Sequence, residues 1–289
     1  MSLTHTSPVR KLKNNVAWVL VTAAFVVAII PLISILWTVV SKGAADFNAN
    51  FLTHSMRNVA EQDPNGGAYH AILGTLEQVG IAVVIVVPLS LMVSIYLVEY
   101  GRGRLAQAVT FFVDVMMGLP SIVAGLFVLS FWILGLGFSA SGFAASIALT
   151  ILMLPIAVRS SEEMLKLVSP ALREASYALG VSKWRTITKV VLPTALPGIV
   201  TGMMLGVARI VGETAPVLLL VGVTDSINAN PFQDAQGSLP LFIFNESQNS
   251  VQNAINRGWA AALTLIILVM LLNLIARLIA WWKAPAAAR

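Results

Sequence analysis

The stretch from Glu174 to Pro193 reads E-A-S-Y-A-L-G-V-S-K-W-R-T-I-T-K-V-V-L-P. It is charged and amphipathic, and it lies between two long hydrophobic segments of the chain. A polar loop with this much local structure, placed between membrane-crossing segments, predicts a docking surface for a soluble partner.

The composition identifies an integral membrane protein. Of the 289 residues, 57% are hydrophobic and only 11% are charged, and the mean hydropathy is +0.84. A soluble domain carries about 25% charged residues, so the chain is far too apolar for that class. It contains no cysteine, which excludes disulfides and thiolate metal sites.

Runs with few or no charged residues predict six membrane-spanning helices in one compact all-α bundle, since a span needs about 20 residues. The run of 44 residues from Val115 to Val158 would extend about 66 Å as a helix, about twice the hydrocarbon thickness. It therefore folds back, and Gly135–Gly142 is the predicted turn. The other expected spans are Asn14–Ser41, Gln78–Val98, about Thr194–Val223, and Gly258–Ala276 continuing to Trp282.

The positive charges predict the orientation of these spans. With both termini in the cytoplasm, fourteen of the 18 Lys and Arg residues lie on the cytoplasmic side and three lie outside. The last of them, Arg209, lies within a span. The isoelectric point near 9.7 is therefore a signal of membrane topology, and nucleic-acid binding is a poor interpretation.

Two short helices are predicted in the loop between spans four and five. Ser169 caps the first and Pro170 occupies its first position. Helical spacing puts Ala171, Ala175, Ala178 and Leu179 on one face. Gly180 ends this helix with positive φ. Ser182 caps a second helix from Lys183 to about Val191, and Pro193 and Pro197 restart the chain into span five. From periodicity alone, an amphipathic helix lying on lipid headgroups is the alternative to a docking surface.

The spacing in this loop resembles the signature loop of bacterial ABC-importer permeases. That signature is E-A-A, a glycine four residues later and a hydrophobic-x-Leu-Pro ending; here Ser176 replaces the last Ala and Val190 the usual Ile. In that family the loop seats in a cleft of the ATP-binding subunit. The resemblance therefore implies a type I ABC-importer permease bundle and assigns ATPase coupling to Glu174, Ala175, Ser176, Gly180, Trp184, Leu192 and Pro193.

Three further motifs resemble the phosphate-importer (Pst) permeases. They are L-P-S-I-V-x-G-L at 119–126, L-P-x3-R-S-S-E-E at 154–163 and A-R-x2-G-E-T-A-P at 208–216. The Arg-Ser-Ser-Glu-Glu version is more similar to the PstA type than to the PstC type. The resemblance implies a bacterial inner-membrane complex with a PstC-like permease as heterodimer partner, two PstB-like ATP-binding subunits and an external phosphate-binding protein.

These expectations divide the chain into five parts. They are a cytoplasmic tail at 1–15, a first transmembrane helix at 16–41, an external loop at 42–71, a permease core at 72–283 with a coupling loop at about 160–193, and a cytoplasmic tail at 284–289. Two outer segments, about Lys42–Ala71 and Thr224–Arg257, are rich in Asn, Gln, Ser and Gly and are expected to be irregular surface loops.

Arg209 and Glu213 are two charges inside span five. They are four residues apart and so share a helix face. An Arg at this depth costs at least about 2.5–3.5 kcal/mol, and we expect it to face the bundle interior or a wet cavity. Pro216 deprives the carbonyl of Gly212 of its helical partner, which predicts a break beside Glu213. Because Arg suits an oxyanion, the predicted substrate pathway comprises Arg209, Glu213, Thr214, Gly212 and Pro216. The alternative is an ion pair that only fixes helix packing.

Other motifs are absent from the sequence. There is no G-x-x-x-x-G-K-[ST], so the ATPase of an ATP-driven importer would be a separate chain. No H-E-x-x-H or G-x-S-x-G occurs, so neither a metal site, a cofactor nor an enzymatic activity of its own is expected. Permeases for sulfate or molybdate, a stand-alone channel or carrier, and a membrane scaffold or phosphate sensor remain as alternatives.

Overall fold

The computed structural model describes residues 7–283, and every regular element within them is a helix. Five helices are long and apolar enough to cross a membrane, and a sixth span is formed if the bent pair of α4 and α5 counts as one. The number of spans predicted from the sequence is therefore confirmed, with a broken third span. The helices are α1 (Pro8–Gly43), α2 (Ala49–Thr53), α3 (Tyr69–Ile95), α4 (Gly103–Met117), α5 (Ser121–Val128), α6 (Gly142–Leu167), α7 (Pro170–Ala178), α8 (Lys183–Thr186), α9 (Leu192–Val211), α10 (Ala215–Leu220), α11 (Leu239–Ser247) and α12 (Gln252–Lys283).

Three π-helical segments join or extend these helices: η1 (Tyr96–Tyr100) after α3, η2 (Leu129–Gly135) after α5, and η3 (Ile187–Val191) between α8 and α9. Helix α3 with η1 and the run from α8 to α9 are therefore single continuous spans. The predicted turn at 135–142 is confirmed, because η2 ends at Gly135 and α6 begins at Gly142.

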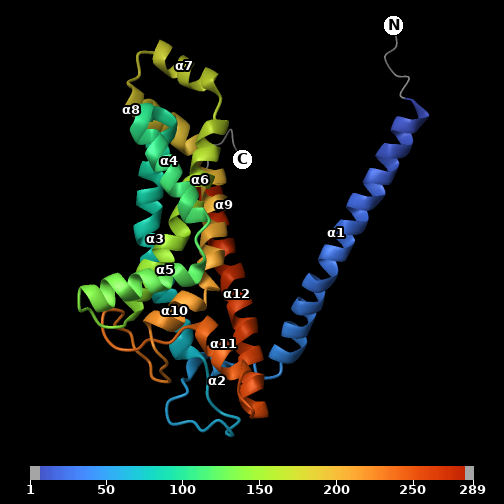
Figure 1. Cartoon of the computed structure of the whole chain (residues 1–289), viewed down its shortest axis with the longest axis vertical. Coiled ribbons are helices and arrows are strands. Elements are labelled where there is room, and N and C mark those ends of the chain that lie inside the picture. Colours follow the sequence, from blue (N-terminus) through green and yellow to red (C-terminus); the bar gives the residue numbers. More distant parts are fainter. Residues whose placement is uncertain (1–6, 284–289) are drawn as a thin grey trace.

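The third span differs from the prediction. It begins at Gly103 and not at Val115, and the chain turns by 106° between α4 and α5. Figure 1 shows α5 lying across the bundle while α4 runs along it. The bend falls at Pro120, which cannot continue a helix and disfavours helical geometry in the residue before it. The prediction begins the third span after Asp114 on the assumption that a charge marks the end of a span. Asp114 instead pairs with Arg159 of α6 within the bundle.

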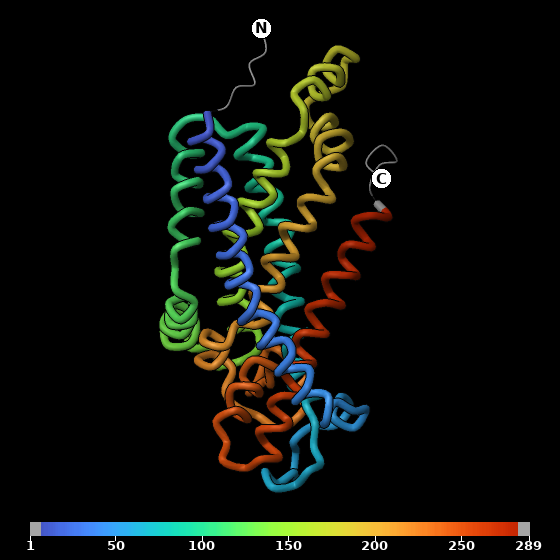
Figure 2. The backbone as a smooth tube through the Cα atoms, turned by 90° about the vertical axis from the view of Figure 1, so that its right-hand side faces the viewer, coloured from blue at the N-terminus to red at the C-terminus, as the bar shows by residue number. Residues whose placement is uncertain are grey.

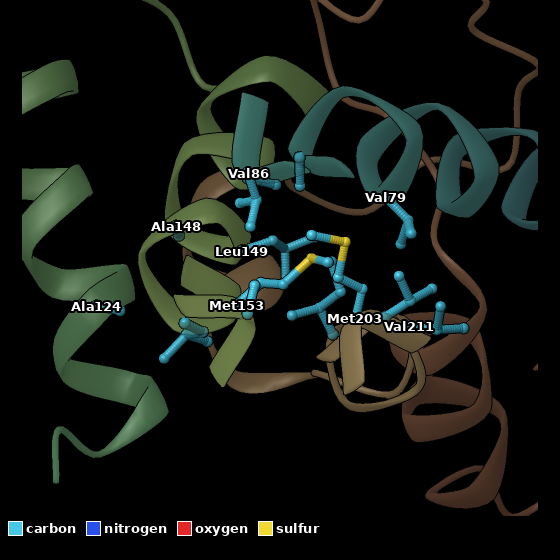
Figure 3. Close-up of a cluster of buried hydrophobic side chains, with 14 of the residues drawn as sticks. Val79, Val86, Ala124, Ala148, Leu149, Met153, Met203 and Val211 are labelled. Carbon is cyan, nitrogen blue, oxygen red and sulfur yellow. The ribbon is translucent and has the colours of Figure 1, made fainter. Parts of the chain in front are cut away.

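The core lies where α3, α6 and α9 pack together, and α5 adds to one side of it (Figure 3). Alanine dominates the α6 side, with Ala144, Ala145 and Ala148 fully buried, so that neighbouring helices approach closely. Larger side chains fill the remaining space. Val79 and Val86 come from α3, Leu149 and Met153 from α6, and Met203 and Val211 from α9.

The two ends of the molecule carry different elements. Helix α7, the beginning of α1 and the end of α12 lie at one end, and α2 and α11 lie at the other (Figures 1 and 2). This arrangement is the one that a cytoplasmic location of both termini requires. Most of the predicted tail at 1–15 is nevertheless helical, because α1 begins at Pro8 with Ser7 as its cap. Residues 1–6 and the tail at 284–289 lie outside the described residues.

The outer segments are not wholly irregular, contrary to the prediction. Helix α2 lies in the first, with Asn48 capping it, and α11 lies in the second, with Ser238 capping it. Apolar side chains of both helices, including Phe51 and Phe242, bury themselves in a second core at the outer end. The polar composition of the segments concealed these short apolar runs.

The loop between spans four and five is shorter than predicted. Helix α6 continues to Leu167, and the chain is helical without interruption from Lys183 to Val211. Pro193 and Pro197 therefore do not restart the chain. The π-helical turns of η3 come directly before Pro193, and such local adjustment accommodates prolines in spanning helices.

Candidate functional site

The predicted break in span five is present. Helix α9 ends at Val211 and α10 begins at Ala215, and Pro216 is in the first turn of α10. Between them the amide of Gly212 donates to the carbonyl of Arg209 at 3.2 Å, and that of Glu213 donates to the carbonyl of Ile210 at 3.3 Å. The backbone thus leaves the helical ladder at the residues that precede Pro216, as the missing proline N–H requires.

Arg209 and Glu213 form an ion pair at this break, with 3.4 Å between the Arg209 Nε and the Glu213 Oε1. The Glu213 side chain is 14% exposed and that of Arg209 is 47% exposed. Of the two environments expected for Arg209, the interior of its own bundle is therefore not the one observed, and the wet cavity stays a prediction. Its guanidinium points out of the subunit because the bundle core beside the break is filled by apolar side chains such as Ile210 and Val211.

A cavity of about 10 Å³ lies beside Glu213, and Thr75, Gln78 and Ser238 also line it. This volume suffices for about one water molecule, and the polar lining supplies its partners. The cavity lies between the break in span five and the outer part of α3.

Gln78, which lines this cavity, belongs to a buried amide pair with Gln236. The Gln78 Nε2 donates to the Oε1 of Gln236 at 3.0 Å and to the carbonyl of Gly237 at 3.2 Å. The Gln236 Nε2 in turn donates to Glu77 and, at 3.2 Å, to the carbonyl of Asn228. The segment before α11 is thereby fixed to α3. Sequence reasoning missed this pair, although Gln78 was visible as a polar residue at the start of an uncharged run.

The L-P-S-I-V-x-G-L motif lies against the break from the other side. Gly125 of α5 meets Pro216 of α10, and a Cβ on Gly125 would come within 2.8 Å of the Pro216 Cα. Thr214 occupies the cap position of α10, where its side chain makes no capping bond. Two motifs that are separate in the sequence thus form one structural unit around the break.

The predicted docking loop (residues 169–193) has the helix–glycine–helix form expected from the sequence. Ser169 caps α7, with 3.3 Å between its Oγ and the amide of Ala171, and Gly180 has φ of +74°. Ser182 occupies the cap position of α8, but its side chain makes no capping bond. Figure 1 shows α7 as the outermost helix at its end of the molecule.

The predicted coupling residues fall into two groups. Glu174, Ala175, Gly180 and Trp184 are exposed, and they lie among the exposed apolar side chains of Leu172, Tyr177 and Leu179. Ser176 is buried, and Leu192 and Pro193 are half-buried. The Ser176 hydroxyl is hydrogen-bonded to the hydroxyl of Thr186 at 2.8 Å, which ties α7 to α8. The exposed residues form a surface on the loop, and the Ser176–Thr186 bond holds together the two helices that carry this surface.

A larger cavity of about 340 Å³ lies at the outer end. Its polar lining includes Glu61, Asp225 and Glu246. Burial raises the pKa of both the Asp225 and the Glu246 carboxyl, and Arg257 opposes this effect without cancelling it. Within residues 7–283, no group of three or more His, Asp or Glu side chains has an arrangement that could hold a metal ion.

Comparison with protein families gives a match over residues 86–286. The family is described as the binding-protein-dependent transport system inner membrane component. The match includes the break in span five, the docking loop and the motifs at 119–126 and 154–163.

Several relatives are similar over nearly the whole chain. The phosphate transport system permease protein PstA 1 of Mycobacterium tuberculosis (strain ATCC 25618 / H37Rv) is 54% identical over 93% of this chain and 88% of its own length. The PstA protein of Mycobacterium leprae is 50% identical over 92% of this chain and 88% of its own length. That of Yersinia pestis is 38% identical over 93% and 90%.

Solved structures share the fold. A bacterial ABC transporter involved in the import of the acidic polysaccharide alginate matches with a TM-score of 0.66 and 14% identity, over 94% of this chain and 98% of that chain. The MetNI methionine ABC transporter, in an inward-facing conformation, matches with a TM-score of 0.57 and 23% identity, over 76% and 95%.

Proposed function

The chain belongs to the family of binding-protein-dependent inner-membrane transport components, and within it to the PstA phosphate permeases; on this premise we propose that it forms one half of a phosphate pathway whose anion-attracting group is Arg209. It is a membrane-spanning permease subunit of a phosphate ABC importer. ATP hydrolysis belongs to another chain of that importer.

The observation that carries this proposal is the Arg209–Glu213 pair at the break between α9 and α10. An arginine that is 47% exposed on an intramembrane face, in a subunit of an importer with two permeases, would face the space between the subunits. Arg is always charged and presents a planar fork of donors that fits a phosphate oxyanion. Glu213, held at 14% exposure, fixes the position of this fork.

The partners follow from the surfaces at the two ends of the molecule. A PstC-like permease supplies the other half of the pathway, and two PstB-like ATP-binding subunits bind the docking loops. The exposed apolar side chains of α7 and α8, with Glu174 beside them, are better suited to burial in a cleft of an ATPase than to exposure to water. An external phosphate-binding protein docks at the end that carries α2 and α11, which places both termini in the cytoplasm.

The transport mechanism is alternating access. Closure of the ATPases on ATP binding moves the docking loops, and the two bundles rotate to open the path first outward and then inward. Arg209 attracts the anion during passage, and the broken backbone at Gly212–Thr214 permits the local change in shape. Because the Arg209 site is exposed and held by only one carboxylate, it binds the anion transiently and releases it.

Sulfate or molybdate as cargo is the nearest alternative, since one arginine does not distinguish these oxyanions. The PstA relatives favour phosphate. A stand-alone channel leaves the surface of the docking loop without a function, and a scaffold or sensor leaves the intramembrane Arg209 without one.

Uptake of radiolabelled phosphate tests the proposal. The chain is expressed with its companion subunits in cells that lack their own phosphate permease, and wild type is compared with Arg209→Ala. We expect ATP-dependent uptake that resists excess sulfate and molybdate and is lost in Arg209→Ala. Full uptake in the variant overturns the pathway, and inhibition by a competitor overturns the selectivity.

A further inference from the structure

The Arg173 side chain of α7 reaches back from the docking loop to the ends of α3 and α6. Its Nη2 lies 3.0 Å from the Glu99 Oε1, and its Nε donates to the same oxygen at 3.1 Å. The two side chains are 17% and 6% exposed, so this pair is much better shielded from water than the pair at Arg209. Shielding makes an ion pair both stronger and more dependent on its geometry.

The other donors of Arg173 fix it to the end of α6. Its Nη1 donates to the carbonyl of Val168 at 2.5 Å, and its Nη2 donates to that of Leu165 at 2.9 Å. The guanidinium therefore joins three elements at once: α7, the end of α6 and the end of α3. A displacement of α7 moves the partner of Glu99 directly.

Lys183 of α8 makes a second attachment to the same place. Its Nζ donates to the backbone carbonyl of Glu99 and lies 4.4 Å from the ring centroid of Tyr100. Both helices of the docking loop thus converge on η1, although Glu99 is 74 residues from Arg173 and 84 residues from Lys183 along the chain.

The receiving segment is the π-helical end of α3. A π-helical turn is rare and less regular than α-helix, and it is often found where function requires local change. From Glu99, α3 runs about 31 Å to Gln78, at 1.5 Å per residue. Gln78 lines the small cavity beside Glu213 and holds the outer segment through Gln236. Helix α3 therefore connects the docking loop to the break in span five.

We propose that Glu99 is a positioning residue for transport, and that the Arg173–Glu99 ion pair transmits ATPase-driven movement of the docking loop sideways into α3. This inference rests on the proposed function, because it requires the ATPase to bind the docking loop. The ion pair adds a second route by which movement of the docking loop reaches the bundle. In the first route, the chain connections of the loop pull on α6 and α9. With α3 moving together with α6 and α9, the whole core responds as one body.

The experiment uses the assembled complex, reconstituted in proteoliposomes with its companion permease, ATPase subunits and binding protein. Three quantities are measured: the amount of ATPase that co-purifies, the rate of ATP hydrolysis with and without binding protein, and phosphate transported per ATP. The variants are Glu99→Gln, Arg173→Lys, Arg173→Gln and the double variant Glu99→Gln/Arg173→Gln. The control is Glu163→Gln, the same change in an exposed carboxylate of α6 at the same end.

We expect Glu99→Gln to keep the ATPase bound and hydrolysing, while phosphate transported per ATP falls at least about fivefold, the lower range of typical coupling between sites. Arg173→Lys keeps the charge and loses less, and the double variant is no worse than Arg173→Gln alone, because both changes break one interaction. Glu163→Gln resembles wild type.

Two results overturn the inference. If Glu99→Gln transports with the wild-type yield per ATP, the pair does not transmit movement. If instead the ATPase is lost in proportion to transport, the pair only maintains the shape of the loop. A wild-type complex that binds no ATPase at all contradicts the proposed function instead, so the two failures are distinguishable.

Discussion

Gly125 of α5 lies directly against Pro216 of α10, so closely that a Cβ on Gly125 would be 2.8 Å from the Pro216 Cα. The atom that it would meet is backbone and cannot rotate away. The broken third span and the broken fifth span therefore support each other at their breaks. The position of α10, and with it that of the break beside Glu213, depends on the absence of a side chain at 125.

Gly125→Val should displace α10 and impair phosphate uptake. Overpacking of this kind costs about 1–3 kcal/mol in stability, which the assembled protein can tolerate. A shift of about 1 Å at a functional group can nonetheless reduce a rate about a hundredfold. We expect the variant to assemble with its ATPase and to lose most of its uptake.

Gly118→Val, the same substitution, is the matched control for this variant. Gly118 belongs to the same bend between α4 and α5, but a Cβ there would have only an ordinary contact, 3.5 Å from the Val115 carbonyl oxygen. Uptake close to wild type is expected. Equal loss in both variants would mean that the bend itself, and not the contact with Pro216, is sensitive.

Local spacing was enough to predict the features that lie within a few residues of one another. The pair of Arg209 and Glu213, the break before Pro216 and the glycine turn at Gly180 each follow from backbone rules or helix periodicity. The direction in which Arg209 points did not follow, because a helix face has no orientation until its neighbours are known.

Contacts between distant parts of the chain were not predictable. The amides of Gln78 and Gln236 are 158 residues apart, and Arg173 and Glu99 are 74 residues apart. A single sequence does not indicate which polar residues pair across such separations. The same limitation explains the error at Asp114, whose ion-pair partner Arg159 lies 45 residues further along the chain.

Glu213→Gln should reduce uptake far less than Arg209→Ala. The Arg209–Glu213 pair is 3.4 Å long and its arginine is 47% exposed. Exposed pairs contribute about 0.2–1 kcal/mol, so loss of the charge at Glu213 should change uptake by at most about fivefold. Concentration-dependent uptake in cells measures both variants side by side. Loss of uptake in Glu213→Gln equal to that in Arg209→Ala would show that the carboxylate itself is required for passage.

Gly180→Asp should release the ATPase. Two effects act at this position: Gly180 has φ of +74°, which costs a residue with Cβ about 1–2 kcal/mol, and the new charge enters the docking surface. Apart from its chain neighbours, no atom of residues 7–283 lies within 4 Å of a Cβ there, so we expect the subunit to fold. Co-purification of the ATPase measures the effect.

Gly137→Asp is the control that separates these two effects. Gly137 has φ of +76° and equally open surroundings, but it lies in the turn before α6, at the other end of that helix from the docking loop. It should keep its ATPase. If both variants lose the ATPase, backbone strain is the cause and the docking surface has not been located.

Arg257 and Glu246 should respond unequally to mutation. Arg257, at 3% exposure, donates to Glu246 at 3.0 Å and to the carbonyls of Asp63 at 2.7 Å and Glu61 at 3.2 Å. It thereby fixes the first outer loop to α12. Arg257→Gln leaves a buried carboxylate without its partner, which costs about 3–5 kcal/mol. Thermal unfolding in detergent and proteolysis between α2 and α3 should both detect the loss.

Glu246→Gln should be much milder, because the amide oxygen still accepts from Arg257 and the cost of burying a charge disappears.

Burial raises the pKa of Glu246, so the folded protein holds the carboxyl proton more tightly than the unfolded chain does. The contribution of Glu246 to stability is therefore complete below its ordinary pKa of 4.5 and is lost as the pH rises through the folded value. Stability should accordingly fall less between about pH 4.5 and neutrality in Glu246→Gln than in wild type. Arg57→Gln serves as the control for Arg257→Gln, because Arg57 is an exposed arginine in the first outer loop. Equal destabilisation by Arg257→Gln and Glu246→Gln would mean that the ion pair outweighs the burial of its carboxylate.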